Sequence, residues 1–314
     1  MRPDPASPSI TRALLRSAGL RPRRRLGQNF LCDGNVLERI ADSALGGGCE
    51  PVVEIGAGLG ALTARLAVRS RLVTTVEIDA ALHPILEQTL AGLANVEVLI
   101  ADFLQLDTVA LFGRTFGPGA GVVAGNIPYG ITSPILERLF ASKDRLLRAA
   151  LLVQTEVADR LTARPGTKAY GSLTVFCAFH GTMTRAFRVP PHLFYPAPDV
   201  GSTLVVFEPR DPPSSLACPT EAMFRVVRAA FAQRRKTLAN AVAGGGLAPD
   251  AASASEALMS CGVDPTRRGE TLTLDEFITI ANALHASALG YSDRSNPDGR
   301  VVNQPVEADF ERTP

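Results

Sequence analysis

Two short segments of this sequence carry residue types that could do chemistry: a glycine-rich turn and an amide–proline–aromatic motif. The turn reads EIGAGLG (54–60) and follows a short apolar run. Glycines at such a place let a ligand approach the backbone closely, where a starting helix offers unpaired N–H groups. Gly56, Gly58 and Ala61 also fit the dinucleotide fingerprint G-x-G-x-x-G/A, so the turn by itself does not select a ligand.

Two acidic residues stand where further apolar runs end. Glu77 closes the second run, and a carboxylate there can accept hydrogen bonds from both hydroxyls of a ribose. Asp102 closes the third run, in position for an adenine amino group. NAD folds and S-adenosylmethionine folds share the acidic residue after the second strand, so these residues predict an adenosine-containing cofactor without choosing between the two.

The motif NIPY (126–129) closes a fourth run and favours S-adenosylmethionine over NAD as the cofactor. It has no evident role in dinucleotide binding, but it suits methyl transfer to an exocyclic amine. The amide of Asn126 and the carbonyl of Ile127 can accept hydrogen bonds from such an amine. Pro128 has no N–H and restricts φ, which suits a rigid set of acceptors. Tyr129 is placed to stack on a base.

These segments need a scaffold that brings strand ends together. Short β-rich runs alternate with helical stretches, which predicts βαβ units and a mostly parallel sheet, an α/β fold. Strands are expected at 51–55, 71–79, 95–102, 121–126 and 147–154, followed by a late antiparallel hairpin of 184–189 and 202–208. In such a sheet the carboxyl ends of the strands share one edge, where α/β folds bind ligands.

The rest of the chain differs in character. Residues 208–219 are rich in Pro and Ser and are typical of a linker. Beyond them the pattern is helical, with helices expected at 220–243, about 250–261 and 273–287. Thr273 and Glu276 form a capping box at the start of the last helix. The length of 314 residues agrees with two domains.

Composition excludes several classes of protein. The five cysteines are scattered and the four histidines have no metal-ligand spacing, so neither a disulfide framework nor a metal site is expected. No apolar run reaches the roughly 20 residues that span a bilayer, and a cytoplasmic location is expected. The net charge is only +1, yet basic residues crowd residues 1–28 and 221–242, which favours an anionic partner.

The ordered motifs resemble those of the ribosomal RNA adenine N6-dimethyltransferase family, in particular its bacterial small-subunit branch. The matching stretches are LGQNFL (26–31), VVEIGAGLGALT (52–63), VEID (76–79), AD (101–102), GNIPYGITSPIL (125–136), QTEVADRL (154–161), YGSLTVF (170–176), FYPAPDVGSTLVVF (194–207), FAQRRKTLAN (231–240) and RRGETLTLDEF (267–277). The chain departs from the family's usual Pro-Lys-Val-Asp-Ser at Asp199 and Gly201. We expect the missing basic residue to weaken one RNA contact without touching the methyl-transfer centre.

The resemblance implies a Rossmann-like class I S-adenosylmethionine-dependent methyltransferase sheet with a small C-terminal all-helical domain. Expected segments are a flexible basic segment at 1–22, the methyltransferase domain at 23–210, the helical RNA-binding domain at 211–290 and a disordered tail at 291–314. The cofactor-binding residues that it implies are Asn29, Leu31, Gly56, Glu77, Asp102 and Asn126. No metal is implied.

For the reaction itself the resemblance implies adenine N6 as the acceptor. Asn126 and Ile127 would orient the amine, and Tyr129 and Phe194 would stack on a base that has left its helix or loop. A basic helix at 224–240 would contact phosphates. The RNA-binding residues expected there are Arg225, Arg228, Arg234, Arg235 and Lys236.

The implied activity is dimethylation of two adjacent adenines in a hairpin loop near the 3′ end of 16S rRNA. The expected partner is 16S rRNA within the 30S subunit or its precursor, during 30S biogenesis; a monomer is expected and a membrane is not. The alternatives are a related large-subunit rRNA enzyme conferring antibiotic resistance, an adenine N6 DNA methyltransferase suggested by the NIPY motif, a non-catalytic assembly or transcription factor that keeps the fold, and an NAD oxidoreductase suggested by the glycine turn. The intact glycine turn and NIPY motif disfavour a non-catalytic protein.

Overall fold

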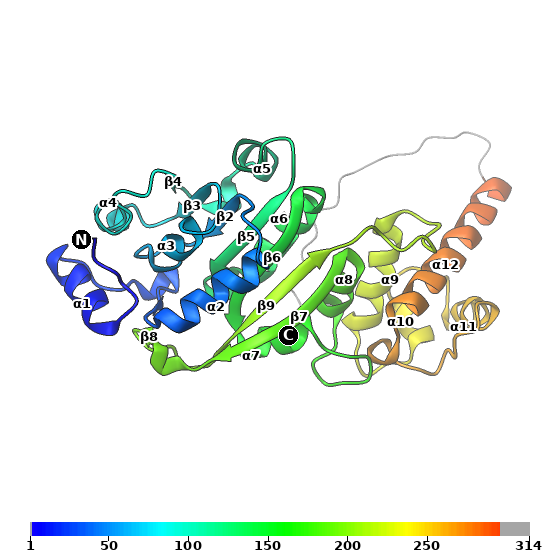
Figure 1. The fold of residues 1–314 in the computed structure, drawn as a ribbon. Coiled ribbons are helices and arrows are strands. Elements are labelled where there is room, and N and C mark those ends of the chain that lie inside the picture. Colours follow the sequence, from blue (N-terminus) through cyan, green and yellow to red (C-terminus); the bar gives the residue numbers. More distant parts are fainter. Residues whose placement is uncertain (1, 296–314) are drawn as a thin grey trace. The chain divides into compact units, whose positions relative to one another are not determined.

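The computed structural model describes residues 2–295 (Figure 1), whose contacts divide into two compact units. The first comprises the chain up to Asp159 together with Gly181–Arg210. The second comprises Arg160–His180 and the chain from Asp211 onward. The linker predicted at 208–219 therefore contains one of the crossings between the units, while residues 160–180, expected with the methyltransferase domain, group with the helical unit.

A seven-stranded sheet forms the centre of the first unit, in the order β4-β3-β2-β5-β6-β9-β7. Its strands are β2 (Val52–Ile55), β3 (Val73–Glu77), β4 (Val96–Ile100), β5 (Gly121–Asn126), β6 (Leu146–Gln154), β7 (Gly181–Val189) and β9 (Ser202–Pro209). The first five are parallel to one another, and β9 pairs antiparallel with both β6 and β7. The predicted parallel sheet and the late hairpin are confirmed.

The strand register brings the chemically interesting strand ends into line. Ile55 pairs with Val76, and Glu77 pairs with Ile100. The glycine turn, Glu77 and the segment after β4 therefore leave the same edge of the sheet. Asn126 is the last residue of β5, which lies on the other side of β2.

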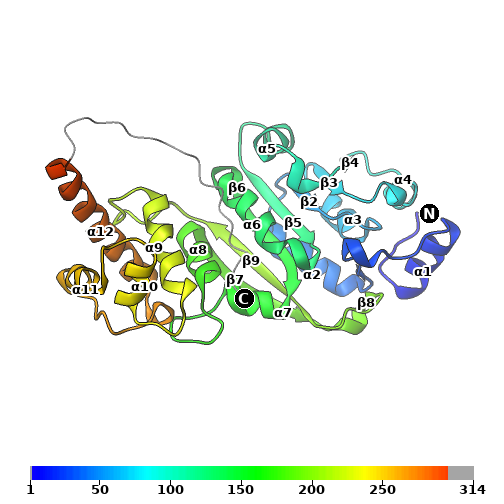
Figure 2. The same cartoon turned by 180° about the vertical axis from the view of Figure 1, so that it is seen from behind.

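Helices cover both faces of this sheet (Figures 1 and 2). The bounds are α2 (Gly34–Leu45) and α3 (Ala61–Ala67) on one face, and α5 (Thr108–Phe116) and α6 (Thr132–Ala141) on the other; α4 (His83–Thr89) and α7 (Thr155–Leu161) follow β3 and β6. The apolar side of α2, including the fully buried Ile40, packs with Val52 and Val122 of the sheet. Burying such side chains contributes roughly 1.5–3 kcal/mol each.

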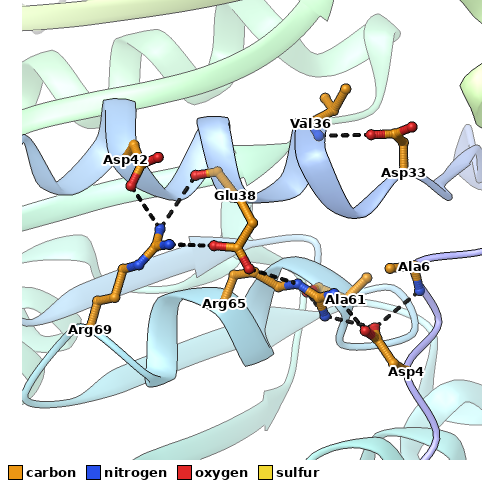
Figure 3. A network of polar contacts seen from close by, with 9 residues as sticks. All are labelled: Asp4, Ala6, Asp33, Val36, Glu38, Asp42, Ala61, Arg65 and Arg69. Atoms are coloured by element: carbon orange, nitrogen blue, oxygen red, sulfur yellow. Dashed lines mark hydrogen bonds and ion pairs between the residues drawn. The ribbon is translucent and has the colours of Figure 1, made fainter.

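The basic N-terminal segment, expected to be flexible, contains a helix that packs on the first unit. Residues Pro8–Ser17 form helix α1, whose N-cap Ser7 accepts a hydrogen bond from the Ile10 N–H. Ahead of it, Asp4 pairs with Arg65 of α3 at 2.6 Å, beside the ion pairs that Arg65 and the following Arg69 make with α2 (Figure 3). Leu14 and Leu15 on the apolar side of α1 are buried, and this packing stabilises the segment. The many arginines of the segment do not reveal this apolar side.

A second, two-stranded sheet joins the N-terminal segment to the segment before β9. Strand β1 (Phe30–Leu31) pairs antiparallel with β8 (Phe194–Tyr195). Phe30 lies opposite Tyr195, and Leu31 lies opposite Phe194. The sequence does not predict this pairing, because two-residue strands have no readable period.

The second unit is helical, with α8 (Ser172–His180), α9 (Thr220–Ala232), α10 (Leu238–Gly244), α11 (Ala251–Ser260) and α12 (Leu274–Ser295). Phe231 of α9 lies 5.9 Å from the ring of Phe277 in α12. The capping box is confirmed, since Thr273 and Glu276 exchange backbone-to-side-chain hydrogen bonds of 2.8 and 3.2 Å. Helix α12 continues through residue 295, past the predicted end, and the rest of the tail lies outside the described residues.

One predicted helix is divided. A single helix is predicted at 220–243, but α9 ends at Ala232 and α10 begins at Leu238. Between them the backbone of Gln233 leaves the helical region, and Thr237 is extended. The break allows the Leu238 side chain to be fully buried in the core. The Leu238 N–H donates to the Arg267 carbonyl at 2.7 Å.

Within residues 2–295, no helix combines the length and hydropathy needed to cross a membrane. The same residues contain no cluster of three or more His, Cys, Asp or Glu side chains arranged to hold a metal ion.

Candidate methyl-transfer site

A cavity opens at the carboxyl edge of the sheet, and most of the predicted site residues line it. Its wall comes from four strand ends and from the N-terminal segment just before β1. The predicted residues on this wall are Asn29, Gly56, Glu77, Asp102, Asn126, Ile127, Pro128 and Tyr129. Residues far apart in sequence thus form one site, as the parallel sheet predicts.

Glu77 is held in place by the backbone around it. Its Oε2 accepts the Gly58 N–H at 2.8 Å, and its Oε1 accepts the Asp79 N–H at 2.9 Å. The side chain is 5% exposed, and this burial raises the pKa of the carboxyl although the two hydrogen bonds oppose the rise. Each carboxylate oxygen keeps further lone pairs, so both oxygens can still accept hydrogen bonds from a ligand.

The glycine turn presents backbone to the same cavity. Gly56 and Gly58 have φ values of +82° and +56°, a region that side chains other than hydrogen disfavour. A Cβ at Gly56 would lie 3.4 Å from the Asn126 carbonyl oxygen, and one at Gly58 would lie 3.2 Å from the Phe30 ring. The turn therefore needs glycine both for its conformation and to keep this part of the cavity open.

Asp102, which follows β4, lines the same cavity. Its Oδ1 accepts the Leu104 N–H at 2.9 Å, which caps the short helix Phe103–Gln105. The side chain is half-buried and lines the cavity beside Phe103. The second oxygen is thus available to a ligand amino group.

Asn126 is oriented from behind by the N-terminal segment. Its Nδ2 donates to the Asn29 carbonyl oxygen at 2.9 Å. An amide whose NH₂ group is engaged in this way presents its oxygen as an acceptor. Asn29 is in turn fixed by a 3.2 Å hydrogen bond from its own Nδ2 to the Gly27 carbonyl.

The rest of the NIPY segment is also restrained. Ile127 is 1% exposed. A Cβ on Gly27, whose φ is +62°, would stand 3.0 Å from the Pro128 Cβ, so the N-terminal segment packs directly on the proline. The Tyr129 hydroxyl lies 2.8 Å from the Oγ of Ser202, a fully buried residue of β9. Burial raises the pKa of Tyr129 above its ordinary value.

Two predicted residues lie off the main cavity. Leu31 is 5% exposed and lines a smaller neighbouring cavity that shares Phe30, Gly56, Gly58 and Asn126 with the main one. Phe194 is 4% exposed and packs in the core between α2 and the sheet. Because β8 pairs with β1, the ring of Phe194 faces the core in this structure and offers no exposed face for stacking.

Glu54, the first residue of the glycine-turn motif, has a role that the sequence analysis did not assign. It is 1% exposed, and its Oε2 accepts hydrogen bonds from the Thr63 and Thr75 hydroxyls. Its Oε1 is buried without a partner, and the residue lines the smaller cavity. Burial raises the pKa of this carboxyl to about 7. An acidic residue inside an otherwise apolar strand, Val52–Ile55, was the available signal.

The predicted RNA-binding residues of the helical unit differ in their surroundings. Arg225, Arg235 and Lys236 are exposed, and Arg228 is half-buried. Arg234 instead donates to the carbonyls of Lys168 and Tyr170 and pairs with Glu270 at 3.2 Å, so it holds its own unit together. Arg235 does not share a helix with Arg225 and Arg228, because α9 ends at Ala232. The single basic helix of the sequence analysis is therefore wrong.

Comparison with known proteins gives a consistent result. The sequence profile described as ribosomal RNA adenine dimethylase matches residues 19–285. A Moorella thermoacetica protein named ribosomal RNA small subunit methyltransferase A is 44% identical over 284 residues, which are 89% of this chain and 98% of that protein. A Bacillus mycoides protein of the same name is 42% identical, over 90% of this chain and 97% of its own length.

Solved structures agree on the fold. The 23S rRNA methyltransferase ErmE superposes with a TM-score of 0.64 at 28% identity, covering 82% of this chain and all of that one. A dimethyladenosine transferase from Plasmodium falciparum superposes with a TM-score of 0.69 at 22% identity, over 82% of this chain and 98% of its own. The Rossmann-like methyltransferase fold with a C-terminal helical part is confirmed.

Proposed function

The chain belongs to the ribosomal RNA adenine dimethylase family, and on that premise we propose how its own residues perform the reaction. It is an S-adenosylmethionine-dependent rRNA adenine dimethyltransferase. The proposed acceptors are two adjacent adenines in a hairpin loop near the 3′ end of 16S rRNA, in the 30S subunit or its precursor. We also propose that the enzyme acts as a monomer in the cytoplasm.

The cavity suits S-adenosylmethionine. Glu77 would bind the ribose hydroxyls and Asp102 the adenine amino group, while Gly56 would lie against the methionine portion and Asn29 and Leu31 would cover it. The unpartnered Oε1 of Glu54 supports this assignment, because a buried carboxylate oxygen needs a donor, and the cofactor's ammonium group is one. The cofactor supplies a sulfonium methyl group as the electrophile.

The Asn126–Asn29 hydrogen bond is the observation that carries the mechanism. Because the amide NH₂ is engaged at 2.9 Å by the Asn29 carbonyl, the oxygen of Asn126 is left to accept from N6 of the target adenine. With the Ile127 carbonyl as second acceptor, both N6 hydrogens would be held and the nitrogen lone pair directed at the methyl group. Orientation of this kind is the main catalytic effect, and no strong base is needed, since the methylated nitrogen is cationic and loses its proton easily.

Tyr129 supports the target base from one side. Its ring lines the cavity, and the Ser202 hydroxyl fixes its far end. Stacking on an aromatic ring contributes roughly 1–3 kcal/mol per base, which offsets part of the cost of extruding the adenine. Phe194 would contribute only if its ring left the core.

A second methyl transfer requires one remaining hydrogen and room for one methyl group. After the first transfer N6 keeps a hydrogen that either acceptor can hold. A Cβ on Gly130 would meet no atom within 4 Å, so the protein is open there. A Cβ on Gly125, which is equally small, would instead stand 2.5 Å from the Ile55 carbonyl oxygen, so this glycine serves the close packing of the sheet.

The deciding experiment offers unmodified 30S particles, 50S particles and duplex DNA to the enzyme with labelled S-adenosylmethionine, followed by mass spectrometry of nuclease digests. We expect N6,N6-dimethyladenosine at two adjacent positions of 16S rRNA. Monomethyladenosine alone after exhaustive reaction would contradict the argument for a second transfer. Dimethyladenosine in the 50S or DNA sample instead would contradict the substrate assignment.

A further inference from the structure

The N-terminal segment carries a set of exposed arginines that the reaction mechanism does not use. No acidic residue occurs between Asp4 and Asp33. Asp4 itself is paired with Arg65, and Asp33 caps α2. The exposed arginines of this segment are Arg12, Arg16, Arg21, Arg24 and Arg25.

The segment lies at the mouth of the methyl-transfer cavity. Leu26, Gly27, Gln28 and Asn29 line that cavity together with the NIPY residues. Arg24 and Arg25 directly precede them, in a short 3₁₀ helix of residues Arg24–Leu26. Arg25 and Arg24 are therefore one and two residues in sequence from Leu26, which lines the cavity.

A buried anchor fixes this part of the chain. Asp79 is 4% exposed and accepts hydrogen bonds from Arg23 at 2.7 Å and from the Gln28 side chain at 2.8 Å. The Arg23 N–H donates to the Gln28 Oε1 at 2.8 Å, which closes the loop on itself. Arg23 is thus paired with Asp79. Arg24 and Arg25 are exposed, and they lie between Arg23 and Gln28, which are both held by Asp79.

The helix that precedes this loop is equally well supported. Leu14 and Leu15 of α1 pack with Phe30 and with Leu82 and Ile85 from the segment after β3. Arg12 projects from α1 with its guanidinium 5.8 Å from the centre of the Tyr195 ring. A rigid basic surface loses little conformational entropy when it binds a polyanion, in contrast to a flexible basic tail.

We propose that Arg24 and Arg25 bind the RNA phosphates that flank the target adenine, with Arg12, Arg16 and Arg21 extending the same surface. This rests on the proposed function. An adenine inserted into the cavity brings its own backbone to the mouth, where the neighbouring phosphates meet this segment. Phosphate contacts position a nucleic acid without reading its sequence, which is what holding a base in register requires. The surface belongs to the methyltransferase unit, whereas Arg225, Arg235 and Lys236 belong to the helical unit.

The test compares Arg24→Gln, Arg25→Gln and the double variant with Arg71→Gln. Arg71 is an exposed arginine just before β3, at the opposite edge of the sheet from the cavity, so it matches the charge change of each single variant. Binding of 30S particles is measured between about 50 and 200 mM salt, together with KM and kcat for methylation and calorimetry of S-adenosylmethionine.

We expect Arg24→Gln and Arg25→Gln each to make the slope of log binding constant against log salt concentration shallower by roughly 0.7–0.9 units. The double variant should raise KM for 30S particles about tenfold. S-adenosylmethionine binding, the melting temperature and the Arg71→Gln variant should match wild type. A wild-type salt slope and KM in the double variant would overturn the proposal while leaving the proposed function intact.

Two further outcomes would also overturn it. A wild-type enzyme that does not methylate 30S particles refutes the proposed function, and this inference with it. Binding to vesicles of anionic phospholipid that is lost in the double variant, with 30S binding unchanged, would reassign the surface to a membrane.

Discussion

Replacing Glu54 by glutamine tests the most unusual electrostatic feature of the site. Glu54 is buried, its pKa is raised from 4.5 to about 7 by that burial, and its Oε1 has no partner. The folded protein therefore holds this proton over a range in which the unfolded chain has released it. Stability must fall as pH rises from about 4.5 to about 7, and then level off.

The size of this effect follows from the shift. Two and a half pH units at about 1.4 kcal/mol each correspond to about 3 kcal/mol of lost stability between pH 4.5 and 8. Glutamine cannot ionise, so Glu54→Gln should gain about that much relative to wild type across this range. The Thr63 and Thr75 hydroxyls can still donate to its oxygen, which keeps the packing comparable.

Urea unfolding at pH 5 and pH 8 measures the change, with Glu221→Gln as an exposed control. The difference in unfolding free energy between Glu54→Gln and wild type should grow with pH, and the control should show no such growth. An equal difference at both pH values would refute the argument that Glu54 is protonated in the folded protein.

The same residue links cofactor binding to pH. A cationic ammonium group beside Glu54 favours the carboxylate, so binding of S-adenosylmethionine near pH 6 should release a proton. Calorimetry in buffers of different ionisation enthalpy detects that release, which Glu54→Gln should abolish. Proton uptake, or a release unchanged in Glu54→Gln, would place the ammonium group elsewhere.

Other substitutions separate orientation from binding. Asn126→Ala should keep S-adenosylmethionine binding but lose about 10²–10³ in turnover, and near-normal turnover would contradict its orienting role. Glu77→Ala should weaken S-adenosylmethionine at least about tenfold in calorimetry, since charge-assisted bonds contribute roughly 1.5–3 kcal/mol each; an unchanged Kd would remove Glu77 from the site. Ser202→Ala and Tyr129→Phe should each lower turnover about fivefold through loss of one hydrogen bond, and their double variant should lose no more than either single one. Additive losses would show that the pair does not act together.

Much of this site is determined by the sequence itself. Glu77 and Asn126 end β-rich runs, and the spacing of those runs predicts a parallel sheet, whose geometry alone gathers strand ends at one edge. Glycine at 56 and 58 is likewise predictable, because the positive φ of the turn is a local requirement. Features of this kind can be predicted, since they depend on residue type and near neighbours.

The tertiary structure decided the remaining features. The pairing of Leu31 with Phe194 places that ring in the core, and it joins segments about 160 residues apart through strands too short to show a period. The break between α9 and α10 follows from where Leu238 finds a buried position, although both flanking segments favour helix. The position of Glu54 inside an apolar strand suggests burial, but only the tertiary structure shows that its Oε1 lacks a partner and that its pKa is raised. Desolvation and long-range packing depend on which distant groups surround a side chain, and the local sequence does not contain that information.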